Sequence, residues 1–152
     1  SEGIKPIGLA ARDRLRCEPC MPLYGHALTP DMTPIEARLS FAVSFDKDFI
    51  GRAALLKQRL AKPQIVLVGF EMIDRGVPRH GYQVTYDGLD VGEVTTGMFS
   101  PTTERYLGLA YVPREISARD TEIEIIIRDK PKRAKIVKRP FYVPAYRRGS
   151  NK

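Results

Sequence analysis

The stretch GYQVTYDGLDVGEVTT, residues 81–96, decides the fold expected for the second half of the chain. Its first part alternates Tyr82, Val84 and Tyr86 with smaller or polar residues, which is typical of a strand with one buried face. Asp87-Gly88 is a common two-residue hairpin turn, and residues 91–96 supply the returning strand. The stretch therefore predicts a β-hairpin.

Further short strands are expected on both sides of this hairpin. They are bounded by prolines and turn residues, and they cover residues 65–72, 106–112, 123–128 and 134–137. Five or six short strands at this spacing predict a small antiparallel barrel or sandwich.

The chain before Pro63 has a different, mostly helical character. Helical spacing of apolar residues predicts a short helix over residues 6–17 and another over residues 51–61, and Thr33 begins a helical turn between them. Residues 39–45 (LSFAVSF) alternate with period two, which predicts a half-buried strand. We expect an α+β protein with a boundary between residues 1–62 and residues 63–152.

Composition limits the classes of protein to consider. With 152 residues, 43% of them hydrophobic and 28% charged, the chain is that of a water-soluble globular protein with one domain or part of two. No apolar run reaches the length of a membrane span. The first residues lack a starting Met and a targeting pattern, which suggests an interior or processed segment.

The net charge of +7 is concentrated in residues 130–148. A basic chain can bind nucleic acid, because Lys and Arg neutralise phosphates. Runs of like charge are more often solvated surface or tails, so we interpret residues 130–148 as a basic tail and expect no nucleic acid partner. Aromatic residues interleaved with basic ones on one strand face, which a stacking platform needs, are not evident.

The densest group of reactive side chains lies in residues 8–26. Cys17 and Cys20 form one Cys-x-x-Cys, with no second pair and no nearby histidine ligands. We predict no metal site and two reduced thiols without a chemical role. His26 and His80 lie on opposite sides of the expected boundary, and the sequence pairs neither with a carboxylate, so we interpret both as surface or loop residues.

Arg12 is the best candidate for a ligand contact in this stretch. Its guanidinium is always charged and can grip a carboxylate through two parallel hydrogen bonds, or it can form a structural salt bridge. Asp13 and Glu18 are surrounded by arginines, which favours their ionised forms and not a role in proton transfer. We therefore predict no catalytic residue in this chain.

Several blocks of the sequence resemble the glycine cleavage system T proteins, a family of folate-dependent aminomethyltransferases. The blocks follow in the family's order and spacing: residues 8–13 (GLAARD), 22–26 (PLYGH), 33–37 (TPIEA), 45–51 (FDKDFIG), 75–82 (RGVPRHGY), 92–97 (GEVTTG), 99–102 (FSPT) and 138–142 (KRPFY). The resemblance covers only the C-terminal part of the family's chain. Where this sequence has Ala10, the family usually has glycine. Where it has Cys17 and Cys20, the family mostly has apolar or small residues.

The resemblance implies that residues 1–62 are the end of the folate-binding region, with helices and a strand, and that residues 63–152 are a C-terminal antiparallel β-barrel with a basic tail. It implies tetrahydrofolate as cofactor, contacted by Arg12 and by Tyr146. The family's N-terminal portion, which supplies the catalytic aspartate, would be required for activity.

The family's reaction moves a one-carbon unit from the aminomethyl-lipoyl arm of the H protein to tetrahydrofolate and releases ammonia. The resemblance therefore implies the lipoylated H protein and the N-terminal portion of the same enzyme as partners. It also implies the cytoplasm, or the mitochondrial matrix of a eukaryote. A related folate-dependent demethylase, the C-terminal domain of a related dehydrogenase, and a basic barrel that binds nucleic acid remain alternatives.

Overall fold

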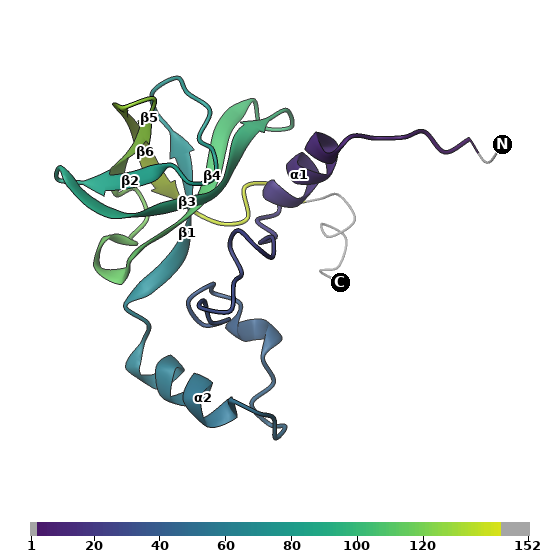
Figure 1. Cartoon of the computed structure of the whole chain (residues 1–152), viewed down its shortest axis with the longest axis vertical. Coiled ribbons are helices and arrows are strands. Elements are labelled where there is room, and N and C mark those ends of the chain that lie inside the picture. Colours follow the sequence, from purple (N-terminus) through teal and green to yellow (C-terminus); the bar gives the residue numbers. More distant parts are fainter. Residues whose placement is uncertain (1–2, 144–152) are drawn as a thin grey trace.

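A computed structural model describes residues 3–143 of the chain. Figure 1 shows a β-barrel with helix α1 beside it and helix α2 below it. Both helices and the barrel agree with the expected α+β fold. The elements are α1 (Leu9–Cys17), η1 (Ser40–Ala42), α2 (Arg52–Ala61), β1 (Ile65–Met72), β2 (Gln83–Tyr86), β3 (Leu89–Ser100), β4 (Arg105–Pro113), η2 (Arg114–Ile116), β5 (Glu122–Ile127) and β6 (Lys130–Val137).

The six strands close into a barrel in the order β1-β4-β3-β2-β5-β6, and every neighbouring pair is antiparallel. The predicted hairpin is β2 and β3, joined at Asp87 (φ 51°) and Gly88 (φ 77°), the pair of positive angles that a tight hairpin turn requires. Alternate residues point inward and form the core: Val66, Val68, Phe70, Met72, Val84, Val94, Ala110, Val112, Ile123, Ile125, Ala134 and Ile136.

The outer face of β1 and β4 is covered as well. Leu67 and Leu109 point away from the barrel interior, yet both are fully buried, and they form a second cluster with Ala27 and Tyr111. The backbone N–H of Leu67 donates to the carbonyl of Glu36 at 2.9 Å. The segment between α1 and α2 is therefore packed onto the barrel.

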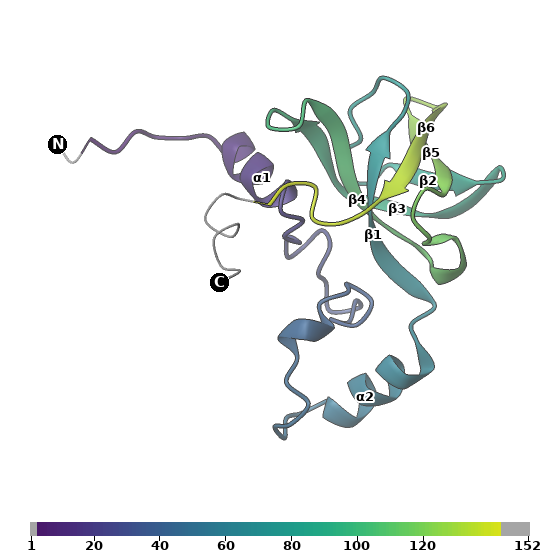
Figure 2. The same ribbon diagram turned by 180° about the vertical axis from the view of Figure 1, so that it is seen from behind.

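The end of the described chain returns to α1. In Figure 2 the yellow segment that follows β6 runs from the barrel toward α1, and the backbone N–H of Tyr142 donates to the carbonyl of Glu18 at 3.0 Å. Phe141 packs on the outer cluster. The last described residues thus contact the end of α1.

Helix α2 has no buried residue, and Leu60 on its surface is 75% exposed. Its polar contacts are with residues 33–45: the Thr33 hydroxyl bonds to Gln58 at 2.6 Å, and Arg52 Nε donates to the carbonyl of Phe45 at 2.8 Å. The guanidinium of Arg59 lies 5.1 Å from the centre of the Phe45 ring. Neither helix in residues 3–143 is long and apolar enough to cross a membrane.

The predicted strand over residues 39–45 is wrong. These residues contain the short 3-10 helix η1, and Phe41, expected on the buried face, is 85% exposed. A strand needs a neighbour to pair its backbone N–H and C=O groups. No strand of the closed barrel pairs with residues 39–45, so an alternating pattern alone does not produce a strand here.

Strand β6 begins earlier than predicted, at Lys130, and includes Pro131. Its first three residues pair only with β5. On the other side, contacts begin at Arg133, whose carbonyl accepts a hydrogen bond from the Ile73 N–H at 2.9 Å, and the pairing with β1 starts at Ala134. One side of the early strand therefore lacks a partner, which is where a strand tolerates a proline.

Candidate functional site

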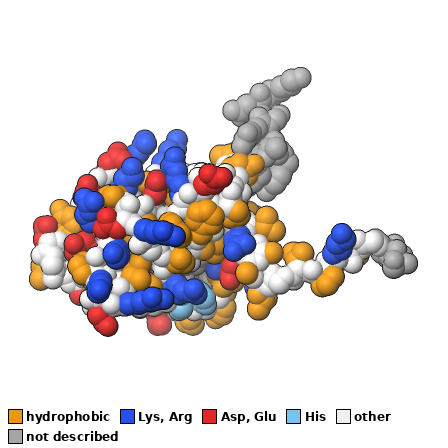
Figure 3. Space-filling view, turned by 90° about the horizontal axis from the view of Figure 1, so that it is seen from above, with side chains coloured by type: hydrophobic (Ala, Val, Ile, Leu, Met, Phe, Trp, Pro, Cys, Tyr) orange, Lys and Arg blue, Asp and Glu red, His pale blue; other side chains and the backbone are white. Residues whose placement is uncertain are grey.

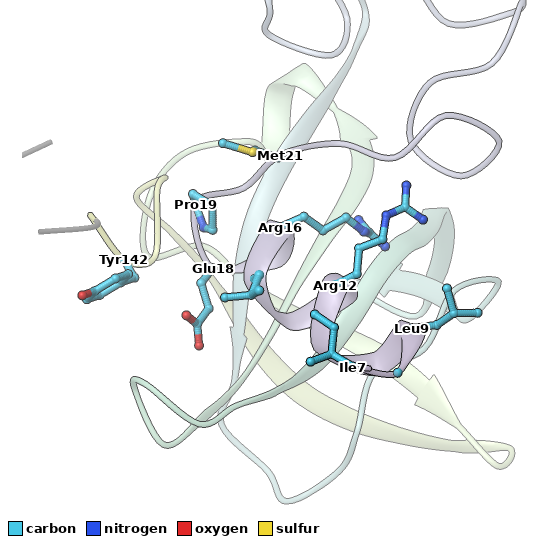
Figure 4. Close-up of a pocket in the computed structure, with 10 residues that line it drawn as sticks. Ile7, Leu9, Arg12, Arg16, Glu18, Pro19, Met21 and Tyr142 are labelled. Atoms are coloured by element: carbon cyan, nitrogen blue, oxygen red, sulfur yellow. The ribbon is translucent and has the colours of Figure 1, made fainter. Parts of the chain in front are cut away.

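A groove of about 760 Å³ runs along α1, and Figure 4 shows the residues that line it. The groove is formed by α1, the chain on either side of it, and one residue from the end of the described chain. Its lining residues are Ile7, Gly8, Leu9, Arg12, Leu15, Arg16, Glu18, Pro19, Met21 and Tyr142.

The walls of the groove are mostly apolar. Leu9 is 78% exposed and Leu15 is 67% exposed, because α1 buries only Cys17. Figure 3 shows hydrophobic side chains between the barrel and the start of the extended N-terminal stretch, whereas basic and acidic side chains are interspersed over the barrel itself. The groove thus offers an apolar surface to a ligand or to another protein segment.

Arg12 is the charged residue of the groove without a partner in the described chain. It lies one turn before Arg16 on the same face of α1, and no carboxylate of residues 3–143 lies within ion-pair distance of its exposed side chain. A free guanidinium beside apolar walls is able to bind a ligand that combines a flat apolar body with an anionic group.

Arg16 has a structural role. Its Nε donates to Asp13 at 2.8 Å, and its Nη1 donates to the Thr96 hydroxyl of β3 at 3.2 Å. The side chain of Arg16 is only 11% exposed. Arg16 therefore fixes α1 against the barrel, and this orientation sets where Arg12 projects.

Glu18 is buried at the end of α1, and sequence reasoning missed its partners. Its carboxylate accepts hydrogen bonds from the hydroxyls of Ser100 at 2.7 Å and Thr102 at 2.8 Å, and from the Thr102 backbone N–H at 3.3 Å. The arginines around it in the sequence suggested ion pairs, but its contacts come from the end of β3 and from the loop between β3 and β4. A carboxylate held in this way anchors α1 and is not placed to move a proton.

The thiols of both cysteines are protonated near neutral pH. Burial is the main cause that raises the pKa of the Cys17 thiol to about 12, and burial raises the pKa of the Cys20 thiol to about 11. Both thiols are free. Since the thiolate is the nucleophile and the metal ligand, the protonated forms have neither property near neutral pH. Residues 3–143 hold no group of three histidine, cysteine or acidic side chains arranged for a metal ion.

The two histidines lie in loops, as predicted, and they contact each other, which was not predicted. The rings of His26 and His80 stack with centroids 4.1 Å apart and planes inclined by 13°. His80 Nδ1 also lies 3.9 Å from a carboxylate oxygen of Glu93. A long-range contact of this kind leaves no periodic signal in the sequence. The stack joins the loop after α1 to the loop before β2.

Tyr146, the second predicted ligand contact, lies outside the described residues. The neighbouring Tyr142 lines the groove.

Two family models match the chain. The glycine cleavage T-protein C-terminal barrel domain matches residues 66–142, and the N-terminal domain of the same protein matches residues 1–47. The first match covers the barrel except Ile65, and the second covers α1 and every lining residue of the groove except Tyr142.

Curated relatives agree with these matches. An aminomethyltransferase of Symbiobacterium thermophilum is 53% identical over 149 residues, which are 97% of this chain and 40% of that protein. An aminomethyltransferase of Bacillus licheniformis is 54% identical over 142 residues, 92% of this chain and 39% of that protein. The chain thus spans about 40% of the length of the curated relatives it matches.

A solved structure is similar in fold. The crystal structure of glycine cleavage system aminomethyltransferase T from Bartonella henselae matches with a TM-score of 0.85 and 34% identity, over 90% of this chain and 39% of that one.

Proposed function

Because the chain belongs to the glycine cleavage T-protein family, we propose that it supplies one wall of the folate site in an aminomethyltransferase. The complete enzyme would transfer a one-carbon unit from the aminomethyl-lipoyl arm of the H protein to tetrahydrofolate and release ammonia. The chain alone would be inactive, because the N-terminal part that carries the catalytic carboxylate in the family is outside it.

The groove along α1 carries this proposal. Its volume of about 760 Å³ lies within the range of small-molecule sites. Tetrahydrofolate combines a flat ring system with carboxylates, and the groove combines apolar walls with the exposed guanidinium of Arg12. Leu9, Leu15 and Met21 would contact the apolar part, and Arg12 would bind an anionic group or orient the catalytic carboxylate of the N-terminal part.

When bound, tetrahydrofolate accepts the one-carbon unit. The residues of this chain have binding and positioning tasks. Arg16 and Glu18 hold α1 on the barrel through Thr96, Ser100 and Thr102, so that Arg12 projects from a fixed support. We keep Tyr146 as a second predicted contact of the cofactor.

We also propose the division into residues 1–62, the end of the folate-binding region, and residues 63–152, the C-terminal barrel with its basic tail. The change from helix α2 to strand β1 at Pro63 supports it. A lipoylated H protein would dock on the complete enzyme, and the basic character of the chain favours an acidic partner.

The experiment compares Arg12→Ala with Arg14→Ala in the complete enzyme. Arg14 lies on the same helix, is exposed and does not line the groove, so its replacement changes the net charge equally. Arg12→Ala should weaken tetrahydrofolate binding by about 1–3 kcal/mol, the cost of removing a charged hydrogen-bonding partner. Titration calorimetry measures the difference.

Equal affinities of the two variants would contradict a folate contact by Arg12. A second measurement tests the need for the N-terminal part: the chain alone, given tetrahydrofolate and aminomethyl-lipoylated H protein, should produce no methylenetetrahydrofolate. Turnover at the rate of the complete enzyme would refute the proposal that its catalytic group lies elsewhere.

A further inference from the structure

A second cavity, of about 350 Å³, lies on the barrel and shares no lining residue with the groove along α1. It is formed by Arg38 from the segment that covers the barrel, by strands β1 and β6, and by the residues that follow η2 and β6. Its nine lining residues are Arg38, Val68, Gly69, Ser117, Arg119, Ile136, Val137, Lys138 and Arg139.

Four of these nine residues are cationic, and none is acidic. Among residues 3–143, Arg38, Lys138 and Arg139 have no carboxylate within ion-pair distance. Arg119 has a loose contact with Asp120 at 3.6 Å, and both side chains are about 70% exposed, so that pair is weak. Within residues 3–143, the cavity therefore concentrates positive charge that only Asp120, at its exposed rim, partly balances.

Arg38 is held in place. Its Nη2 donates to the Ser117 hydroxyl at 3.0 Å, and that hydroxyl donates to the carbonyl of Arg114 at 2.7 Å. Within residues 3–143, its guanidinium makes no other hydrogen bond. Arg38 also has a positive φ of 57°, a conformation that costs free energy in a non-glycine residue and is common at binding sites.

Arg139 is held from the other side of the cavity. A Cβ atom placed on Gly69 would lie 2.8 Å from Cγ of Arg139 and 2.8 Å from the Phe141 ring. The aliphatic part of Arg139 thus lies directly on β1 at a position where only glycine leaves room. This packing fixes the direction of the side chain without using its guanidinium.

The pKa values of Arg38 and Arg139 are both lowered, which indicates that their charged forms are disfavoured. Burial, followed by the charges of Arg139 and Arg114, lowers the pKa of Arg38, and burial lowers the pKa of Arg139. Like charges held together and partly removed from water are unfavourable unless an anion balances them.

We propose that Arg38 and Arg139, with Arg119 and Lys138 at the rim, form a binding site for an oxyanion, a phosphate or a carboxylate. Guanidinium groups bind both kinds of oxyanion through paired hydrogen bonds. The group would come either from a free phosphate compound or from an acidic protein segment. The site does not include Arg12. A result against the oxyanion site would therefore leave the proposed folate contact of Arg12 standing, and the reverse also holds.

The test is titration calorimetry of the 152-residue chain at low ionic strength, where exposed charges are least screened. The probes are inorganic phosphate, pyrophosphate and a synthetic hexapeptide of glutamate. We expect saturable binding of at least one probe. Binding of phosphate or pyrophosphate would identify a free anion, and binding of the peptide alone would identify an acidic segment as the source.

Variants locate the site. Arg38→Gln and Arg139→Gln should each weaken binding about tenfold or more, the loss expected for one charge-assisted contact. Lys130→Gln is the matched control, because Lys130 is an exposed residue at the opposite end of β6 and outside the cavity. It makes the same change in net charge and should leave the affinity unchanged.

If Arg38→Gln and Arg139→Gln lose the native circular dichroism spectrum, Arg119→Gln replaces them. Its side chain is 70% exposed, so the fold does not depend on it, and a smaller loss of affinity is expected. Absence of saturable binding by all three probes overturns the proposal. An equal loss in Lys130→Gln also overturns it, because it would show general attraction to a basic surface.

Discussion

The carboxylate of Glu18 accepts a hydrogen bond from the hydroxyl of Ser100 at 2.7 Å, although 82 positions separate the two residues in the chain. Thr102 gives the same carboxylate two more hydrogen bonds. The last turn of α1 is thereby joined to the loop between β3 and β4. The position of Arg12 depends on this junction.

Glu18→Ala should lower the free energy of unfolding by about 1–3 kcal/mol, since it leaves the buried hydroxyl of Ser100 without its acceptor. Urea denaturation measures the change. Glu122→Ala is the control, because Glu122 is exposed and lies on β5, away from the junction. Equal stability of Glu18→Ala and Glu122→Ala would show that the junction contributes nothing.

Tyr111→Phe should detach the covering segment from the barrel more than it unfolds the barrel. The Tyr111 hydroxyl donates to the Ala27 carbonyl at 2.7 Å, and both groups are buried. We expect a loss of about 1 kcal/mol and faster cleavage by trypsin in residues 18–39. Tyr86→Phe, on β2, should leave the cleavage rate as it is. Unchanged cleavage in Tyr111→Phe would mean that the apolar contacts alone hold the segment.

Stability should fall as the pH rises above about 9, and the cysteines should contribute to this fall. The unfolded thiols titrate near 9.0, whereas the folded pKa is about 12 for Cys17 and about 11 for Cys20. Between those values the native state binds more protons than the unfolded state, so the free energy of unfolding decreases with pH.

Measuring unfolding free energies across this pH range for the native chain and for Cys17→Ala and Cys20→Ala tests the assignment. Each variant should have a shallower slope than the native chain, whatever its absolute stability. Identical slopes would exclude the thiols as a cause, and the tyrosine and lysine titrations would have to account for the fall.

Gly92→Ala should prevent closure of the barrel or reduce stability by several kcal/mol, as severe overpacking does. A Cβ on Gly92 would overlap the carbonyl oxygen of Tyr111 on the neighbouring strand, and backbone in a closed barrel cannot move aside. In Gly76→Ala the nearest atom is the terminal Cδ1 of Ile127 at 2.8 Å, a flexible methyl that can rotate. Thermal melts of the two variants should therefore differ widely.

The strands of the barrel could be predicted because the signals for each strand and turn lie in residues close together in the sequence. Alternation around Tyr82, Val84 and Tyr86 identifies a strand, and Asp87-Gly88 identifies its turn. The same reasoning failed at residues 39–45, where alternation was present but no strand was available as a neighbour. Alternation of apolar residues indicates which side chains can face a core. It does not indicate whether a neighbouring strand is present to pair with the backbone.

The site was predictable only in part, for a related reason. The chemistry of the guanidinium and then the resemblance drew attention to Arg12, and the groove includes that residue. The partners of Glu18 and the stack of His26 on His80 join segments far apart in sequence, and neither charge patterns nor motif spacing indicates which distant residues meet.

The buried outer face of β1 bears on the order in which the protein folds. Leu67 and Leu109 are shielded by a segment that precedes both strands in the chain, to which Phe141 is added after β6. During synthesis this segment leaves the ribosome first. It is therefore available to pack on the apolar outer face of β1 and β4 when the barrel closes. A chain trimmed to residues 63–152 would lack that cover and expose an apolar surface along β1 and β4. This exposure predicts aggregation of the barrel on its own.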